Sequence, residues 1–341
     1  PSAGKLSTAA GVLEEMRGQH PVIDEILQYR ELTKLKSTYV DALPLQVNPK
    51  TGRIHTSFNQ TGTVTGRVAS QNPNLQNIPT RTDLGRRVRQ GFIAAPGTRL
   101  LSIDYSQIEL RIMAHISQDE AMLEAFRQGQ DIHAATAAAI YNIPLEKVEK
   151  NQRRHAKAIN FGLIYGMSAF GLTRATDLTL AEAENYIKAY FDHFPKVKTW
   201  LDNTRVLAAK QGYVETLLGR RRYFPNLQTG TNYAMRQREE REAINAPIQG
   251  TAADIIKLAM IALPDAFEQA RLKGCMLLQV HDELIFEVPE KEVAETIATA
   301  KGVMEHTMPL DVPLLTEART GSNWGELEPV SDSVIEDLTD V

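Results

Sequence analysis

The chain has 341 residues and a mass of 38.0 kDa, which suits about two domains or one large domain with a long insertion. Its 43% hydrophobic and 23% charged residues exclude collagen-like, disordered and coiled-coil proteins, and its single cysteine excludes a disulfide scaffold. The net charge of -4 argues against a simple nucleic-acid coat, so any nucleic-acid binding would need basic residues clustered on one face.

Neither a membrane span nor a signal peptide is expected from this sequence. No window reaches the roughly 18 uninterrupted apolar residues of a membrane span, and the N-terminus lacks the charged-then-apolar pattern of a signal peptide. We therefore expect a cytoplasmic protein that does not bind membranes. Because the sequence begins at Pro1 without an initiator methionine, we also expect a piece of something longer.

The first third of the sequence predicts helices followed by strands. Apolar residues between Thr8 and Tyr39 recur with a helical period, and His20-Pro21 divides this stretch into two helices. Short strands and polar turns are expected between residues 43 and 70. The apolar run that ends at Asp104 is typical of a buried strand.

Most of the remaining chain, to about residue 272, reads as helix. Ser117-x-x-Glu120 and Thr179-x-x-Glu182 have the form of capping boxes, and residues 213–218 are predicted to interrupt the helices with a strand. Alternating apolar residues around His281-Asp282 then predict a hairpin with an acidic tip. A helix near 291–306 and a strand near 313–320 follow. We therefore predict an α+β fold, with one antiparallel sheet built from distant segments and a helical insertion.

Two aspartates follow predicted buried strands. Asp104 and Asp282 would lie close together if their strands are neighbours, and the repulsion between them would be relieved by a divalent cation. Oxygen ligands without a His or Cys cluster suit Mg²⁺, and two such ions can support in-line phosphoryl transfer. Taken singly, either aspartate is better explained as a turn residue or a helix cap.

A cationic stripe marks the predicted helix 151–166. Arg153, Lys157, Phe161 and Tyr165 step by four, so they lie along one face, where they could bind a triphosphate and stack on a base. A solvated basic stripe beside buried aromatic residues is the alternative. Gly162 and Gly166 favour a ligand, because glycine is costly inside a helix and indicates close approach to the backbone.

Three ordered motifs resemble motifs A, B and C of family A DNA polymerases. They are Asp104-Tyr-Ser-Gln-Ile-Glu-Leu-Arg111, Arg153-x3-Lys157-x3-Phe161-Gly-x2-Tyr165-Gly166 and Gln279-Val-His281-Asp282-Glu283. Further similar segments are Thr65-Gly66-Arg67, Gln76-Asn77-Ile78-Pro79 and Asn245-Ala-Pro-Ile-Gln249-Gly250-Thr251. The similarity covers residues 7–325, nearly the whole chain.

This resemblance implies a right-hand fold of palm, fingers and thumb. Residues 1–40 would form the thumb base, 41–115 the first part of the palm, 116–235 the fingers and 236–341 the second part of the palm. The long thumb helices and any nuclease domain would lie upstream of residue 1. The implied activity is template-directed addition of deoxynucleotides to a primer 3′-hydroxyl, with release of pyrophosphate. The implied partners of a monomeric, bacterial, nucleoid-associated enzyme are primer-template DNA and deoxynucleoside triphosphates.

The resemblance also assigns roles at the reacting end of the nucleotide. Asp104, Asp282 and the Tyr105 carbonyl would bind two Mg²⁺ ions, for which Mn²⁺ can substitute. Arg153 and Lys157 would hold the triphosphate, and Lys157 would also protonate the leaving pyrophosphate. His133 would lie near the β-phosphate; without the resemblance, it reads as a surface histidine.

Other implied roles concern the base, the sugar and the duplex. Phe161 would pack on the incoming base and sugar, and Tyr165 would occupy the template position. Glu109 would exclude a ribose 2′-hydroxyl, and Gln107 would also contact the nucleotide. The expected contacts to the minor groove of the primer-template are Arg67, Arg241, Asn245, Gln249 and His281.

Three other functions compete with this interpretation. A single-subunit RNA polymerase would share the palm, but Glu109 and Phe161-Gly162 argue against it. A metal phosphohydrolase built on His281-Asp282 would need a helix and further His ligands. A non-catalytic or weakly active DNA-binding fragment stays open, because a chain without a thumb would grip duplex DNA less firmly.

Overall fold

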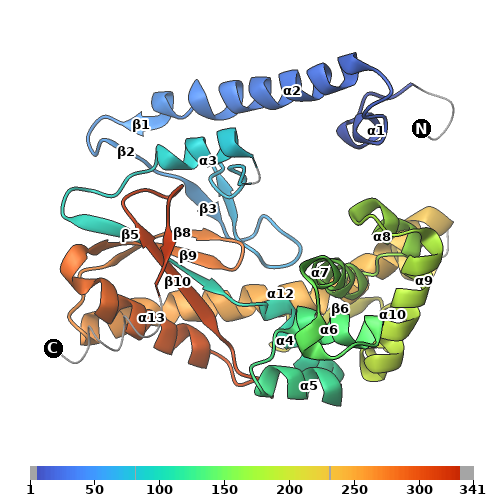
Figure 1. Cartoon of the computed structure of the whole chain (residues 1–341). Helices are drawn as coiled ribbons and strands as arrows, with labels where there is room; N and C mark the ends of the chain where they lie inside the picture. The colour runs from blue at the N-terminus through green and yellow to red at the C-terminus, as the bar shows by residue number, and fades with distance from the viewer. Residues whose placement is uncertain (1–5, 81, 230–231, 331–341) are drawn as a thin grey trace.

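A five-stranded antiparallel sheet forms the centre of the computed structural model, which describes residues 6–80, 82–229 and 232–330 (Figure 1). The strand order is β11-β10-β5-β9-β8. These strands are β5 (Thr98–Tyr105), β8 (Cys275–Val280), β9 (Glu283–Pro289), β10 (Thr316–Gly321) and β11 (Glu328–Pro329). Because β5 pairs with β9 and β10 from the far end of the sequence, the predicted sheet of distant segments is confirmed.

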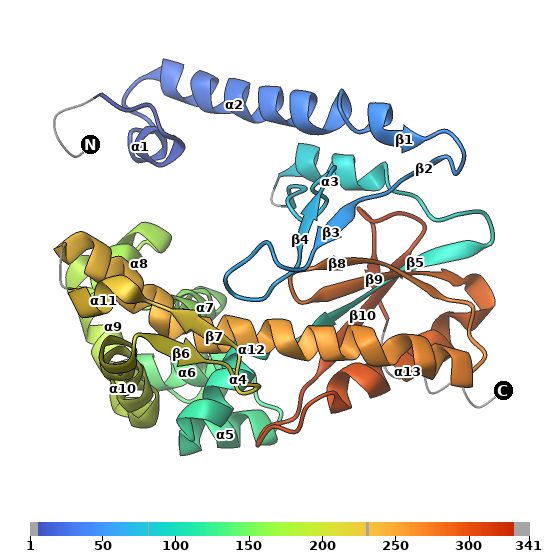
Figure 2. The ribbon, with the colours of Figure 1, turned by 180° about the vertical axis from the view of Figure 1, so that it is seen from behind.

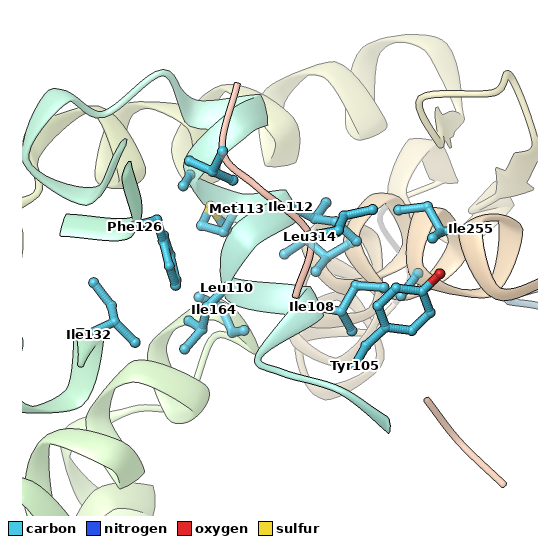
Figure 3. Packing of buried hydrophobic residues seen from close by; sticks show 14 of the residues in the cluster. Tyr105, Ile108, Leu110, Ile112, Met113, Phe126, Ile132, Ile164, Ile255 and Leu314 are labelled. Atoms are coloured by element: carbon cyan, nitrogen blue, oxygen red, sulfur yellow. The ribbon is translucent and has the colours of Figure 1, made fainter. Parts of the chain in front are cut away.

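The central strand β5 is buried on both faces, which explains its unbroken apolar run. Leu101 and Ile103 point into the main core, whereas Leu100 packs into a second core with Leu35 and Tyr39. Figure 3 shows side chains of the main core gathered around the helix that follows β5. Burying the strand on both sides fixes the position of Asp104 at its end.

The N-terminal segment lies over the second core. It comprises α1 (Ala10–Glu15), α2 (Pro21–Leu35), a π-helical turn (Lys36–Val40), a 3-10 turn (Pro44–Gln46), the hairpin of β1 (Val47–Asn48) and β2 (Arg53–Ile54), the hairpin of β3 (Ser57–Asn59) and β4 (Ala69–Gln71), and α3 (Asp83–Gln90). The predicted helix break is confirmed: His20 caps α2 by accepting from the Val22 amide, and Pro21 is the first helical residue. Helix α3 was not predicted, because its two apolar residues are too few to show a period.

The helical insertion lies to one side of the sheet in both views (Figures 1 and 2). It comprises α4 (Ile108–Ser117), α5 (Glu120–Arg127), α6 (Ile132–Tyr141), a 3-10 turn (Leu145–Lys147), α7 (Lys150–Ile164), α8 (Ala169–Ala175), α9 (Leu180–His193), α10 (Pro195–Gln211), the hairpin of β6 (Tyr213–Glu215) and β7 (Arg221–Tyr223), and α11 (Pro225–Thr229). The predicted strand 213–218 is shorter than expected, because the chain turns at Thr216, whose amide donates to the Arg220 carbonyl.

The long helix α12 (Tyr233–Gln269) runs from the insertion back to the sheet (Figure 2), where it packs against α13 (Val293–His306). Among the described residues, α12 is the one helix long and apolar enough to cross a membrane, but 67% of its apolar window is buried within the protein. Such burial is typical of the core helix of a folded domain. A 3-10 turn (Glu290–Glu292) precedes α13, and the last long strand begins at Thr316 rather than near Pro313.

Helix capping corrects one prediction and confirms another. Thr179 and Glu182 form the predicted capping box of α9. The box predicted at Ser117 is wrong, because Ser117 is the last residue of α4 and Asp119 caps α5 by accepting from the Met122 amide. Because α4 continues through Ser117, the next helix begins later and its cap is Asp119.

Candidate active site

A cavity of about 320 Å³ opens where β5 ends, between the sheet and the helices α6 and α7. It brings together most of the residues that the motifs predicted, from five separate parts of the chain. The residues that line it are Asp104, Tyr105, Ser106, Gln107, Ile108, Glu109, His133, Arg153, Lys157, Phe161, Asp282 and Glu317.

Acidic side chains crowd one wall of the cavity. Asp104 pairs in register with Glu283 on β9 and with Glu317 on β10, and the Tyr105 amide donates to the Asp282 carbonyl at 3.2 Å. Like charges directly opposite one another destabilise a sheet. Desolvation and the neighbouring Asp282 raise the pKa of Asp104, and burial also raises the pKa of Asp282. The wall therefore favours a bound cation.

The donors at this wall fit a hard divalent cation that keeps several of its waters. The described residues hold no group of three or more His, Cys, Asp or Glu side chains arranged for a metal. Asp104 and Asp282 can supply two carboxylates. Tyr105 can supply only its backbone, because its buried hydroxyl donates to the Met304 carbonyl at 2.8 Å. Two carboxylates and a carbonyl are a sufficient protein contribution for an ion such as Mg²⁺.

Two acids that are register neighbours of Asp104 were not assigned a role from the sequence. Glu283 is held by the Ser102 hydroxyl, which donates to its carboxylate, and burial raises the pKa of Glu283. Glu317 reaches the cavity only because of the register between β5 and β10. Glu283 could have been found from the sequence, because it directly follows Asp282. Nothing near Glu317 in the sequence indicates that it lies beside Asp104.

The opposite wall is cationic and comes from α7. Arg153 Nε lies 2.6 Å from Asp131 Oδ2, and Asp131 also caps α6 by accepting from the His133 amide. Lys157 lines the same cavity and makes no ion pair with any described residue, so no acid of the described chain neutralises its ammonium. Phe161 lies one turn further along the same face.

The two glycines of this segment have a different explanation from the one expected. Gly166 lies beyond the end of α7 with φ +69°, where a Cβ would be 2.8 Å from Ile244 Cδ1. Gly162 is inside α7, and a Cβ there would meet Met167 Sδ at 3.0 Å. The expected close approach to the backbone is confirmed, but side chains of the protein itself make it, so these two glycines do not support a bound ligand.

His133 is buried rather than exposed, with 2% of its surface accessible. Burial lowers its pKa to about 4, so the ring is neutral near pH 7. Its Nδ1 lies 3.1 Å from the amide nitrogen of Asn160, a residue of α7 that the sequence did not single out. The surface alternative for His133 is wrong, because α6 packs this face against α7.

Glu109 connects the cavity to two further predicted residues. Arg67 Nη2 lies 3.0 Å from one carboxylate oxygen, and the Tyr165 hydroxyl donates to the other. Burial raises the pKa of Glu109, and Arg67 opposes that shift. Tyr165 thus reaches the cavity wall through Glu109 rather than lining the cavity itself.

The residues predicted to contact a duplex lie outside the cavity lining. His281 forms the hairpin tip with φ +59°, and burial and the nearby Arg67 lower its pKa. Its carbonyl accepts from Gln279 Nε2, and Gln279 in turn accepts from Gln76 Nε2 at 3.0 Å. The remaining three lie at intervals of four along α12, namely Arg241, Asn245 and Gln249. The Asn245 Oδ1 is buried without a hydrogen-bond partner among the described residues.

An antiparallel sheet with a helical insertion, and a cavity lined by acids and by Arg153 and Lys157, are the features expected of a nucleotide polymerase. Comparison with known proteins supports this class. The profile of DNA polymerase family A matches residues 2–326. The chain belongs to DNA polymerase family A.

Two similar proteins are both bacterial DNA polymerase I enzymes. DNA polymerase I of Pseudomonas aeruginosa is 53% identical over 326 residues, which cover 95% of this chain and 36% of the relative. The thermostable DNA polymerase I of Thermus aquaticus is 52% identical over 322 residues, 94% of this chain and 38% of the relative. The chain thus spans less than two fifths of the length of these relatives.

A solved structure has the same fold. It is described as the POL domain of Pol1 from M. smegmatis in complex with DNA primer-template and dNTP. It matches with a TM-score of 0.88 and 44% identity, over 95% of this chain and 57% of the other. The right-hand architecture that the motifs implied is thereby confirmed.

Proposed function

We propose that this chain carries out template-directed DNA synthesis, adding deoxynucleotides to a primer 3′-hydroxyl and releasing pyrophosphate. One observation carries the proposal: acids from two distant strand ends face Arg153 and Lys157 across one cavity. That arrangement supplies cation ligands on one wall and triphosphate ligands on the other. The M. smegmatis neighbour, which has primer-template and dNTP bound, supports this choice of partners.

The charged side chains of the cavity bind the metal and the triphosphate. Asp104, Asp282 and the Tyr105 carbonyl hold the divalent metal, which as Mg²⁺, or Mn²⁺ in its place, would activate the attacking oxygen and steady the leaving group. Arg153 and Lys157 bind the triphosphate. Lys157, which no acid among the described residues pairs, is the proton donor for pyrophosphate.

The remaining groups set the position of base, sugar and duplex. Phe161 packs on the incoming base and sugar beside His133, and Gln107 and Glu109 border the sugar. Tyr165 marks the template position. Arg67, Arg241, Asn245, Gln249 and His281 contact the minor groove, where donors can check base-pair geometry without reading sequence. The unpaired Asn245 Oδ1 is suited to such a partner.

The same proposal assigns the regions of the chain and its setting. Residues 1–40 serve as thumb base, 41–115 and 236–341 as palm, and 116–235 as fingers. The chain acts as a monomer in the bacterial cytoplasm at the nucleoid, without a membrane partner. Weak duplex binding by this chain is compatible with the proposal, because the chemistry resides in the cavity.

Single-nucleotide addition at low salt tests the proposal. Purified chain, a labelled primer-template, Mg²⁺ and one complementary dNTP should give a primer longer by one nucleotide. A separate anisotropy measurement of duplex binding distinguishes a weak polymerase from an inert binder. Extension that persists in full after Asp104→Ala or Asp282→Ala would refute the assignment, and efficient addition of ribonucleotides would favour an RNA polymerase.

A further inference from the structure

Asn160 is a fully buried polar side chain in the contact between α6 and α7. Its accessible surface is 0%, and its neighbours in sequence, Ile159 and Phe161, pack against the main core. A buried amide costs free energy unless its groups are hydrogen-bonded. Among the described residues, the Asn160 side chain forms hydrogen bonds with Thr136 and His133, both on α6.

The hydroxyl of Thr136 determines which way round the Asn160 amide must lie. Thr136 Oγ1 donates to the Ile132 carbonyl at 2.7 Å, which uses its only proton. It can therefore only accept from Asn160, and the amide nitrogen, at 3.0 Å, is nearer to it than the amide oxygen Oδ1, at 3.2 Å, which favours the nitrogen on this side. The amide nitrogen carries a second hydrogen, and this one faces His133 Nδ1 at 3.1 Å.

The orientation of the amide in turn decides the tautomer of His133. Because Asn160 donates to Nδ1, that nitrogen must present a lone pair, and the single proton of the neutral ring resides on Nε2. Nε2 forms no hydrogen bond with any described residue, and the ring lines the cavity beside Arg153 and Lys157. The charged groups nearest the ring are Asp131, Arg153 and Lys157. An N–H donor is thus free to meet an anion in the cavity.

We propose that Asn160 is a positioning residue, which holds His133 in the orientation and tautomer that present an Nε2–H donor to a phosphate oxygen of the bound nucleotide. This inference rests on the proposed function for the identity of the anion. Asn160 itself touches neither nucleotide nor metal. Its contribution is to keep the donor neutral and aimed, so that triphosphate binding requires no reorganisation of the ring.

Nitrogen-15 NMR of the full chain labelled at histidine tests this directly. Near pH 7, long-range proton–nitrogen correlations should show His133 with Nδ1 unprotonated and Nε2 protonated. Titration with a dNTP and Mg²⁺ should shift the Nε2 resonance. The wild-type protein alone can overturn the inference. It would do so if the His133 ring were protonated at Nδ1, or if saturating dNTP did not shift the Nε2 resonance.

Variants separate positioning from packing. In Asn160→Asp the new carboxylate accepts from Nδ1–H, so both ring nitrogens should become protonated. Asn160→Leu should raise the KM for dNTP several-fold with a smaller change in kcat. Thr136→Ala removes the hydroxyl that orients the amide, so it should let the amide turn over and add the Nδ1–H tautomer. Thr296→Val, at a fully buried position of α13 outside the cavity, is the matched control and should keep the tautomer and KM of the wild type. Equal effects of Asn160→Leu and Thr296→Val on KM would contradict the inference.

The two proposals fail in distinguishable ways. If dNTP shifts Nε2 as described but no primer is extended, the inference stands and the proposed synthesis fails. If primers are extended normally while His133 carries its proton on Nδ1, the synthesis stands and the role of Asn160 fails.

Discussion

The hydroxyl of Tyr165 donates a hydrogen bond to the carboxylate of Glu109, joining the residue that ends α7 to the first turn of α4. Arg67 occupies the other oxygen of the same carboxylate at 3.0 Å. One carboxylate thus connects the loop between β3 and β4, the start of α4 and the C-terminal end of α7. A movement that carries the end of α7 away from α4 would break this hydrogen bond.

Replacing Tyr165 tests how much this contact stabilises the fold. Tyr165→Phe leaves a buried carboxylate oxygen without its donor, so the free energy of unfolding should fall by about 1–3 kcal/mol. Urea denaturation measures the change. Tyr29→Phe is the control, since Tyr29 is 69% exposed. Equal stability of the two variants would show that the hydrogen bond contributes nothing net.

Neutralising Asp104 should separate activity from stability. Asp104→Asn should lower single-nucleotide addition by roughly a hundredfold or more, because a preorganised charge at the reacting centre is lost. Without metal, the variant should be as stable as the wild type or more stable, since it relieves the repulsion from Asp282. Asp192→Asn, at an exposed position outside the cavity, is the control. Destabilisation of the metal-free Asp104→Asn protein would contradict the electrostatic argument.

The burial of Asp104, together with its repulsion from Asp282, gives a pH dependence with a definite sign. The folded state raises the pKa of Asp104 above its ordinary 3.8, so it binds this proton more tightly than the unfolded state. The contribution to stability is present below that value and is lost as the pH rises towards the folded pKa. Denaturation of the metal-free protein should show this loss, and Asp104→Asn should reduce it. A slope that is unchanged in the variant would count against this explanation.

The contribution of His133 to stability should have the opposite pH dependence and be lost as the pH falls. Burial lowers its pKa to about 4 from 6.5, so the unfolded chain takes up a proton first as the pH falls. Stability present above pH 6.5 should therefore be lost between pH 6.5 and about 4, by at most about 3 kcal/mol. His133→Gln keeps an acceptor for Asn160 but does not titrate. The stability difference between the two proteins should change across this window; a constant difference would contradict the prediction.

Two helical glycines should respond oppositely to alanine. At Gly250 a Cβ would lie 2.5 Å from Thr216 Cγ2, and Thr216 is held in place by its hydrogen bond to Asp254 at 2.8 Å. Gly250→Ala should therefore lower the free energy of unfolding by about 1–3 kcal/mol. At Gly302 nothing lies within 4 Å, so Gly302→Ala should stabilise by up to about 1 kcal/mol. Thermal denaturation of both variants tests this contrast, which would fail if both shifted in the same direction.

Interactions within a single element were readable from the sequence. The apolar run before Asp104, the alternation on either side of His281-Asp282 and the capping box at Thr179 were confirmed, because each depends on residues a few positions apart. The period of α7 likewise placed Arg153, Lys157 and Phe161 on one face. The resemblance to the family motifs predicted that this face of α7 lies near Asp104 and Asp282.

Only the tertiary structure decided what lies between elements. It placed Glu317 beside Asp104, turned Gly166 toward Ile244 rather than toward a ligand, and set Asn160 against His133. Strand register and helix packing bring together side chains that are distant in sequence, and the cores on both sides of β5 fix their relative positions. Local periodicity carries no information about that register, so the chemistry of single residues came from the sequence and their pairing from the fold.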